Sequence, residues 1–262
     1  MNLIRGIRTG LRHRPLRQAS RALREVLFPS LCPACRAAPG PDICDSCLSE
    51  WQTVIDPCPY CGAPLGAAVS HTPIICPRCH NTGIGHVRGV QVLGVYRGIL
   101  AKLIGDAKAG AHNGAVQALA KSMAERIHLP EPHVTIIPLP PNRGRREGPH
   151  LATACAKAVA RTHQRPLQQA LRTTRTAAEQ HRLLAHQRQQ AVRDLFRCTH
   201  NVSESILLID DILTSGSTLA AAARCLRQAG ARRIWACCLA RSVDSRDPRP
   251  AVDAGTPATP HQ

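Results

Sequence analysis

The sequence predicts an α/β fold in which a parallel sheet is flanked by helices and preceded by a small cysteine-rich module. Short runs of consecutive apolar residues predict strands that are buried on both faces, and segments with helical spacing of apolar residues separate them. Four Cys-x-x-Cys pairs precede the first of these runs. A chain of 262 residues with 2% aromatic residues can form one sizeable aliphatic core plus a small module.

Charge and composition divide the chain into four parts. Residues 1–24 carry seven Arg and no acid, residues 25–84 carry two basic and five acidic residues, and residues 85–242 carry 23 basic and nine acidic residues. We expect a basic N-terminal arm, a cysteine module, an α/β domain and, at residues 243–262, a Pro-containing disordered tail. The arm suits a helix on nucleic acid or an anionic surface, a transit-like leader, or a loosely ordered extension.

The net charge of +17 favours anionic partners, either a polyphosphorylated sugar or nucleic acid. An Arg-rich composition can also reflect nucleotide bias in the genome, so charge alone does not choose between these partners. No apolar run approaches 18 residues, and we therefore expect no transmembrane segment. Because no signal-peptide pattern is present, we expect a cytoplasmic protein in which metal binding explains the cysteines better than disulfides do.

Eight of the 13 cysteines lie in four pairs with two residues between the sulfurs. Such a pair lets both thiolates bind one ion, and two pairs complete a tetrahedral site with no open position, which indicates a structural role. Pairing in sequence order predicts two zinc ribbons whose Zn²⁺ ions supply much of the folding energy; a cross-braced pairing remains an alternative. The expected metal ligands are Cys32, Cys35, Cys44, Cys47, Cys58, Cys61, Cys76 and Cys79.

The elements of the α/β domain follow from the spacing of its apolar residues. Alternation predicts a strand at 90–95, and apolar runs predict strands at 134–139, 206–209 and 232–239. Residues 167–196 are polar and predict a helical or loop excursion, a candidate lid. Helices are expected around residues 100–104, at 114–127 and 150–163, and from Leu219 to a stop at Gly230.

The apolar run 206–209 ends in two acids and a hydroxyl-rich turn that together predict a phosphosugar site. Gly216 permits close backbone approach, and the loop amides and the following helix N-terminus offer donors to a phosphate. Carboxylates repel phosphate but accept hydrogen bonds from a sugar diol. The simpler alternative is that the acids end a strand and Ser217 caps a helix. The candidate residues are Asp210, Asp211, Thr214, Ser215, Gly216, Ser217 and Thr218.

A basic turn follows the predicted strand 134–139. The carboxyl end of a strand in an open α/β sheet is where such folds bind ligands, and guanidinium groups match pyrophosphate oxygens. Arg143, Arg145 and Arg146 are therefore candidates for binding pyrophosphate, and a solvated surface cluster is the alternative.

Residues 210–218 closely resemble the phosphoribosyl-pyrophosphate (PRPP) binding motif of type I phosphoribosyltransferases. Roughly residues 27–241 resemble the ComF family (ComFC/GntX-like proteins), in which a Cys₄ zinc module precedes a phosphoribosyltransferase domain. Further matching residues are Leu27-Phe28-Pro29, Tyr96-Arg97-Gly98, Lys108, Ile137-Pro138-Leu139-Pro140, Gln180, Leu183, Arg188, Val192 and Phe196.

The resemblance implies that Asp210 and Asp211 hold the ribose hydroxyls and that residues 214–218 hold the 5-phosphate. It also implies that Mg²⁺ accompanies PRPP. For biology it implies DNA uptake in natural transformation, or use of the DNA taken up, in a bacterial cytoplasm. Single-stranded DNA and other competence proteins are then the expected partners.

Some positions depart from the family pattern. Where the family has Arg-Gly-Phe-Asn-Gln this chain has Glu147-Gly148-Pro149-His150-Leu151, and Ala177 and Ala191 replace a Thr and an Asn. No side chain in the motif is an obvious nucleophile, so the catalytic residue is open. The hypotheses are a phosphoribosyltransferase, or a catalytically inactive zinc-containing factor that binds single-stranded DNA and keeps the PRPP cradle as a scaffold or effector site. A nucleotide-sensing regulator is a third, for which no separate DNA-reading helix is recognisable.

Overall fold

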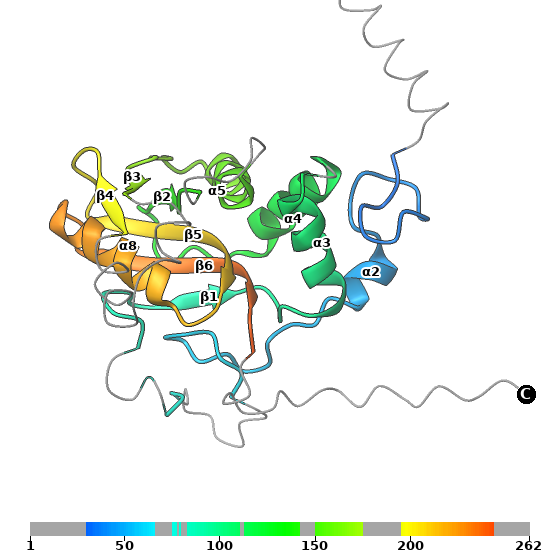
Figure 1. Ribbon diagram of the computed structural model, residues 1–262, viewed down its shortest axis with the longest axis horizontal. Coiled ribbons are helices and arrows are strands. Elements are labelled where there is room, and N and C mark those ends of the chain that lie inside the picture. The colour runs from blue at the N-terminus through cyan, green and yellow to red at the C-terminus, as the bar shows by residue number, and fades with distance from the viewer. Residues whose placement is uncertain are drawn as a thin grey trace, which may run out of the picture.

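A four-stranded parallel sheet forms the centre of the protein in a computed structural model, which describes residues 30–65, 75–77, 79, 83–110, 113–141, 150–174 and 195–243 (Figure 1). The strand order is β1-β6-β5-β2, and every neighbouring pair is parallel. This arrangement confirms the predicted fold class. The strands are β1 (Val90–Val92), β2 (Thr135–Pro138), β5 (Ser205–Leu213) and β6 (Arg233–Arg241).

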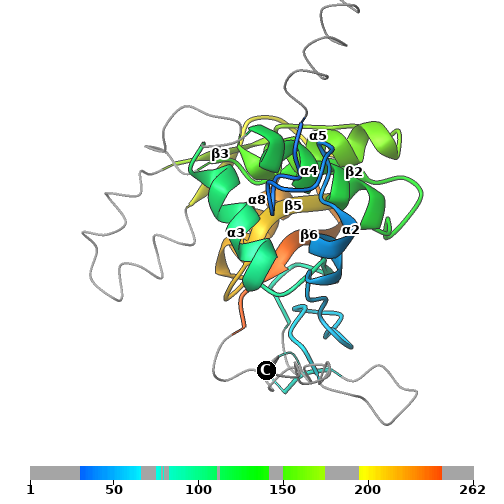
Figure 2. The same ribbon diagram turned by 90° about the vertical axis from the view of Figure 1, so that its right-hand side faces the viewer.

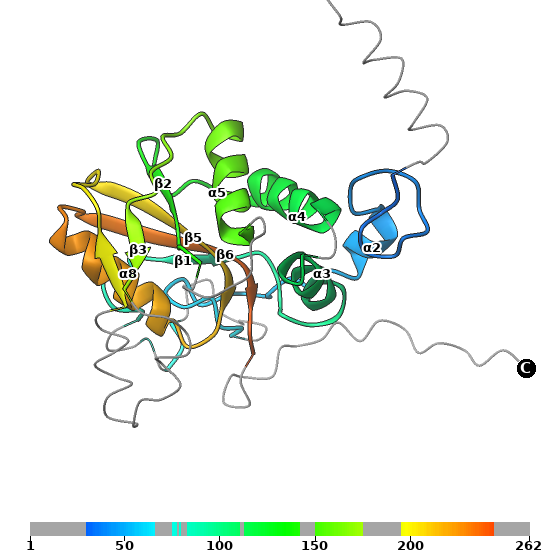
Figure 3. The same cartoon turned by 45° about the horizontal axis from the view of Figure 1, so that its top comes forward.

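Helices cover both faces of the sheet, as Figure 3 shows. Side chains alternate along a strand, so Leu207 and Ile209 of β5 pack toward one group of helices while Ile206 and Leu208 pack toward the other side. The first face carries α3 (Gly98–Lys108), α4 (Asn113–Arg126) and α5 (Leu151–Thr162), and the second carries α8 (Ser217–Gln228).

Two predictions about individual elements are wrong. Strand β5 does not end at the acids but continues through them to Leu213, and it pairs with β6 on both sides of Asp211. Parts of residues 167–196 are strands rather than a helical or loop excursion, because β3 (Leu171–Thr173) and β4 (Phe196–Cys198) form a separate antiparallel pair. The interior of the candidate lid, residues 175–194, lies outside the described residues.

The first cysteine segment packs on the α/β domain and shares its core (Figure 2). Cys32, Cys47 and Trp51 are buried in the same apolar cluster as the inner residues of α3 and α4. The indole nitrogen of Trp51 donates a hydrogen bond to the carbonyl oxygen of Leu93 over 3.1 Å. Lys102 of α3 donates to the carbonyl oxygen of Ala34, between the first two cysteines, over 2.8 Å. This segment contains the short helix α2 (Asp45–Ser49).

Within the residues described above, none of the helices combines the length and the apolar composition that crossing a lipid bilayer requires. The basic arm at residues 1–24 and residues 244–262 of the expected tail lie outside those residues.

Candidate functional site

Strand β5 carries the two predicted acids to the carboxyl edge of the sheet, where their carboxylates make different contacts. Asp211 lies on the face that α3 and α5 cover and is only 9% exposed. Its Oδ1 is 2.8 Å from Nζ of Lys108, the last residue of α3. The Oδ1 of Asp210 instead accepts a hydrogen bond from the backbone N–H of Asp211 over 2.8 Å. The two carboxylates therefore have different surroundings, although they are adjacent in sequence.

Asp210 is a weakened acid. Burial is the main reason, and the negative charge of Asp211 adds to it; together they raise the pKa of Asp210 to about 7, although the backbone N–H of Asp211 and the charge of Lys108 act the other way. Near neutral pH this carboxyl is therefore divided between its neutral and its charged form. A neutral carboxyl can donate a hydrogen bond as well as accept one, whereas the charged form only accepts.

The hydroxyl-rich turn presents its side chains to solvent. Ser215 Oγ lies 3.0 Å from Ser217 Oγ, and the backbone N–H of Ser217 donates to Ser215 Oγ over 3.4 Å. Helix α8 begins directly after Gly216, and no side chain caps its N-terminus, so the alternative in which Ser217 is the helix cap does not hold. The exposed hydroxyls belong to Thr214, Ser215, Ser217 and Thr218.

Gly216 is required for two reasons besides access to an anion. Its φ of +79° is in the left-handed region, which side chains disfavour. A Cβ at this position would also lie 2.7 Å from Cδ1 of Ile84, which packs beneath the turn. Ile84 belongs to the stretch that joins the second cysteine segment to β1, so a residue far away in sequence supports the turn.

Arg241, at the end of β6, fixes the base of the turn from the other side. Its Nη1 donates to the carbonyl oxygens of Leu213, Thr214 and Ser242, over 3.3, 2.5 and 2.6 Å. The residue is 4% exposed, so its contribution is positional. Neither Arg241 nor Lys108 was among the predicted site residues. Lys108 was among the residues that match the ComF family, but that match assigned it no role; for Arg241 the signal was a basic residue at the end of an apolar strand.

The basic turn with Arg143, Arg145 and Arg146 lies outside the described residues, as do Gln180, Arg188, Ala177 and Ala191. Two of the positions that depart from the family pattern are described. His150 precedes α5, with its Nδ1 3.2 Å from Thr153 Oγ1, and Leu151 is 2% exposed in the core. Leu151 therefore packs in the interior, where it has no access to a ligand.

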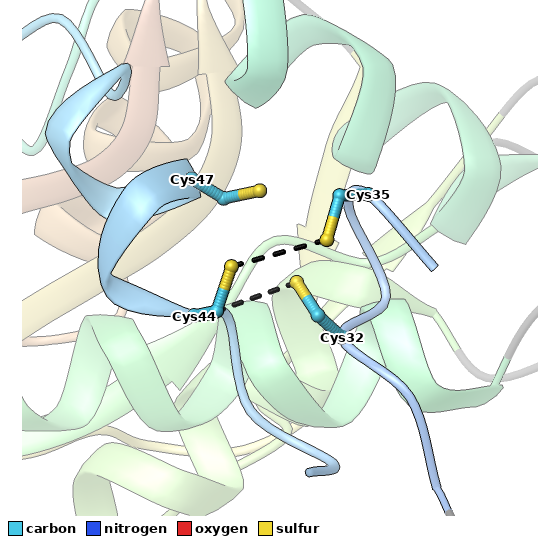
Figure 4. A group of neighbouring side chains, drawn as sticks. All are labelled: Cys32, Cys35, Cys44 and Cys47. Atoms are coloured by element: carbon cyan, nitrogen blue, oxygen red, sulfur yellow. Dashed lines mark hydrogen bonds between the residues drawn. The ribbon is translucent and has the colours of Figure 1, made fainter. Parts of the chain in front are cut away.

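The eight paired cysteines gather in two groups of four, and each group takes its members from consecutive pairs. Within each group the sulfur atoms all lie within 4.8 Å of one another, close enough for four thiolates to bind one tetrahedral ion. Figure 4 shows the first group. The grouping follows sequence order and not the cross-braced alternative. The first group is Cys32, Cys35, Cys44 and Cys47, and the second is Cys58, Cys61, Cys76 and Cys79.

Backbone donors around the first cysteine of each group favour a thiolate. Burial raises the pKa of Cys32, but backbone N–H groups of Cys44, Cys35 and Ala34 outweigh it and lower the pKa to about 6. The N–H of Cys44 approaches Cys32 Sγ at 3.4 Å. Backbone donors in the second group lower the pKa of Cys58 in the same way, against the effect of burial. Sulfur ligands in this arrangement fit a soft tetrahedral ion such as Zn²⁺.

Comparison with known proteins places these features in a family. Residues 170–256 match the family of the phosphoribosyl transferase domain. DNA utilization protein YhgH of Escherichia coli O6:H1 is 31% identical over 232 residues, which cover 83% of this chain and 100% of that protein. The chain belongs to the ComF family. The proteins of the same name from Escherichia coli K12 and Salmonella typhi are 30% and 28% identical, with the same coverage of both chains.

The phosphoribosyltransferase match in this ComF protein runs from β3 through the acids, the turn and α8 to β6. Lys108 and Ile84 lie before its first residue. Two residues of the candidate site in this chain therefore lie outside the matched segment. Ile84 follows the second cysteine group in the sequence, and Lys108 lies on α3, which contacts the first cysteine segment.

Proposed function

We propose that this ComF protein binds PRPP together with Mg²⁺ in the cradle formed by the end of β5 and the turn before α8, and that it serves the uptake or use of DNA. One observation carries the proposal: three features lie together near the end of β5. They are the two adjacent acids, four exposed hydroxyls, and the N-terminus of α8, which its N-cap residue Gly216 does not cap with a side chain. The hydroxyls and amides suit the 5-phosphate, and the acids suit the ribose hydroxyls. The similarity to proteins named for DNA utilization supports the biological role.

The proposal concerns binding and does not specify a transfer reaction. The described residues identify no acceptor site, and the segments 142–149 and 175–194 that flank the cradle lie outside them. If transfer takes place, Mg²⁺ would neutralise the pyrophosphate as it leaves, and positioning and electrostatics would be the contribution of the protein. The alternative without catalysis keeps PRPP as an effector.

We also propose that each cysteine group holds one structural Zn²⁺ ion. The donor set of four thiolates leaves no open position, so the metal would have no catalytic task. The metal would supply folding energy above all to the second segment, whose buried cluster contains only Ala63 besides its cysteines.

The binding of PRPP is tested by titration calorimetry on the full-length protein. We expect Mg²⁺–PRPP to bind, and replacement of Ser217 and Thr218 by alanine to weaken binding about tenfold or more, because charge-assisted hydrogen bonds to the phosphate are lost. Thr53→Ala, which removes an exposed hydroxyl in a loop near the first cysteine group, should leave the affinity unchanged. Absence of binding to the unaltered protein would contradict the proposal, and equal weakening by the Thr53 variant would show that the effect is not local.

One observation favours DNA as a partner of the same protein. Arg172 of β3 and Arg197 of β4 are directly opposite each other in the antiparallel pair, and both are exposed. Like charges in this position repel, so a bound phosphate would stabilise the strand pair. We propose that this arginine pair contacts the backbone of single-stranded DNA.

The salt dependence of DNA binding tests the arginine pair. Replacing Arg172 and Arg197 by alanine should reduce the slope of log affinity against log salt by about 1.4, the value for two phosphate contacts on a single strand. A matched variant with Lys157 and Arg161 of α5 replaced removes the same charge from another exposed surface. Equal slopes for the two variants, measured by fluorescence anisotropy with an oligonucleotide, would mean that Arg172 and Arg197 make no specific contact.

A further inference from the structure

Asp211 has one cationic partner among the described residues. Its Oδ1 is 2.8 Å from Nζ of Lys108, and the side chains are 13% and 23% exposed. The other titratable groups that face the acid pair are the thiols of Cys155 on α5 and Cys238 on β6. Burial raises the pKa of both thiols above the ordinary value, so they supply no charge at neutral pH. Arg241 lies at the end of the same strand but donates to backbone carbonyls of the turn.

The position of Lys108 follows from the helix that carries it. Leu100 and Ile104 are fully buried on the inner stripe of α3, and Lys108 comes one turn after Ile104 on the same stripe. The stripe that packs on the sheet therefore ends with an ammonium group, opposite the carboxyl end of β5. A cation is also favoured here because the C-terminus of a helix carries the negative end of its dipole.

The ion pair leaves the cradle with an unequal pair of acids. Lys108 occupies one oxygen of Asp211 and balances its charge, which a nearly buried carboxylate needs. Among the described residues, no other group bonds to the side chain of Asp211, so its second oxygen can accept a hydrogen bond from a ligand. None of the described cations contacts Asp210 directly, and its Oδ1 accepts a backbone N–H instead. Two carboxylates without counter-ions would repel a ligand that carries phosphate and pyrophosphate. The ammonium of Lys108 offsets the charge of Asp211 and so reduces this repulsion.

We propose that Lys108 is a positioning residue of the sugar site: its ion pair with one oxygen of Asp211 orients the carboxylate so that the other oxygen accepts a ribose hydroxyl. This inference rests on the proposed binding of PRPP and adds to it a residue outside the segment that matches the phosphoribosyl transferase domain. The competing explanation is an ion pair that only fastens α3 to the sheet.

Two substitutions at this position separate the explanations. Lys108→Met keeps the length and the apolar stem of the side chain but removes its charge, and Lys108→Arg keeps the charge. Lys102→Met on the same helix is the matched control, because Lys102 also pairs with an aspartate, Asp106, and not with Asp210 or Asp211. All three variants are made in the full-length protein, and their thermal stability is measured beside the affinity for Mg²⁺–PRPP from pH 6 to pH 9.

We expect Lys108→Met to weaken the binding of Mg²⁺–PRPP about tenfold at pH 7, the usual size of a lost charge-assisted hydrogen bond in a desolvated site. The pH at which binding reaches half its maximal strength should also rise, because the charge of Lys108 lowers the pKa of Asp210 and Asp210 holds its proton more tightly without it. Lys108→Arg should restore both the affinity and the pH midpoint, and Lys102→Met should change neither.

If Lys108→Met lowers stability but leaves the affinity and its pH midpoint unchanged, the ion pair only fastens the helix and the inference is wrong. The same conclusion follows if Lys102→Met weakens binding equally. If the unaltered protein does not bind Mg²⁺–PRPP, both the proposed function and the role of Lys108 are wrong. If the unaltered protein and the Lys108→Met variant bind equally well, only the role of Lys108 is wrong.

Discussion

Asparagine in place of Asp210 is expected to stabilise the fold above pH 7 and to weaken the binding of Mg²⁺–PRPP. The unfolded chain releases the Asp210 proton near the ordinary pKa of 3.8, whereas the folded protein holds it to about pH 7. The contribution of this carboxyl to the free energy of unfolding is therefore full below pH 3.8, falls as the pH rises toward 7, and is lowest above it. Asparagine carries no charge, so it avoids this loss.

Asparagine also keeps an oxygen that can accept the backbone N–H of Asp211, so the local geometry is retained. We expect the free energy of unfolding at pH 8 to rise by roughly 1–3 kcal/mol relative to the unaltered protein, and the difference to shrink at pH 5. Denaturant unfolding at the two pH values measures it. Glu50→Gln, which neutralises an exposed acid at the end of α2, is the control and should change stability little at either pH.

If the Asn variant is more stable but binds Mg²⁺–PRPP less tightly, Asp210 serves ligand binding at the expense of stability. If the Asn variant is less stable at pH 8, the raised pKa is not a property of the folded protein. If its affinity for Mg²⁺–PRPP is unchanged, the ribose hydroxyls do not bind to this carboxylate, and the proposed arrangement of the ligand is wrong.

Loss of a cysteine ligand is expected to have the largest effect on stability, and the effect should differ between the two groups. Cys47 is part of the large core that includes α3 and α4, whereas Cys79 belongs to a small cluster of four buried residues. We expect Cys47→Ser to reduce the zinc content from two ions to one per chain and to lower the free energy of unfolding on the order of 5 kcal/mol. Cys79→Ser should also remove one ion but lower global stability less.

Metal analysis of the purified protein and thermal unfolding measure the two quantities. Cys155→Ala, which replaces a buried thiol outside both groups, should retain both ions. An unaltered protein without zinc would overturn the assignment of the metal. If the two Cys→Ser variants lose the same amount of stability, the packing of the first group in the large core does not make the domain more sensitive to loss of its metal ion.

Much of the fold was accessible from the sequence because its strands are buried on both faces. The apolar runs at 134–139, 206–209 and 232–239 correspond to β2, β5 and β6, and the helices packed on them lie where the spacing of apolar residues predicts. Strands β3 and β4 were missed because each has three residues, too few for alternation to be recognised, and they lie within a polar stretch.

The site was predicted less completely than the fold, for a physical reason. The motif identifies residues that are close together in sequence, but the ion pair of Asp211 depends on Lys108, and the shape of the turn depends on Ile84 and Arg241. These contacts join elements that only the folded chain brings together. The continuation of β5 through two carboxylates has the same origin, since a strand can bury Asp211 only where a cation reaches it from another element.

The packing of Ile84 beneath Gly216 couples the cysteine-rich front of this chain to the glycine turn. A chimera that joined a foreign front segment to this domain would have to present a branched aliphatic side chain at the same point, or the turn would lose the side chain that packs beneath it. The junction between the two halves is thus part of the candidate site, and a chain cut there would keep the whole signature motif yet lose a residue that supports it.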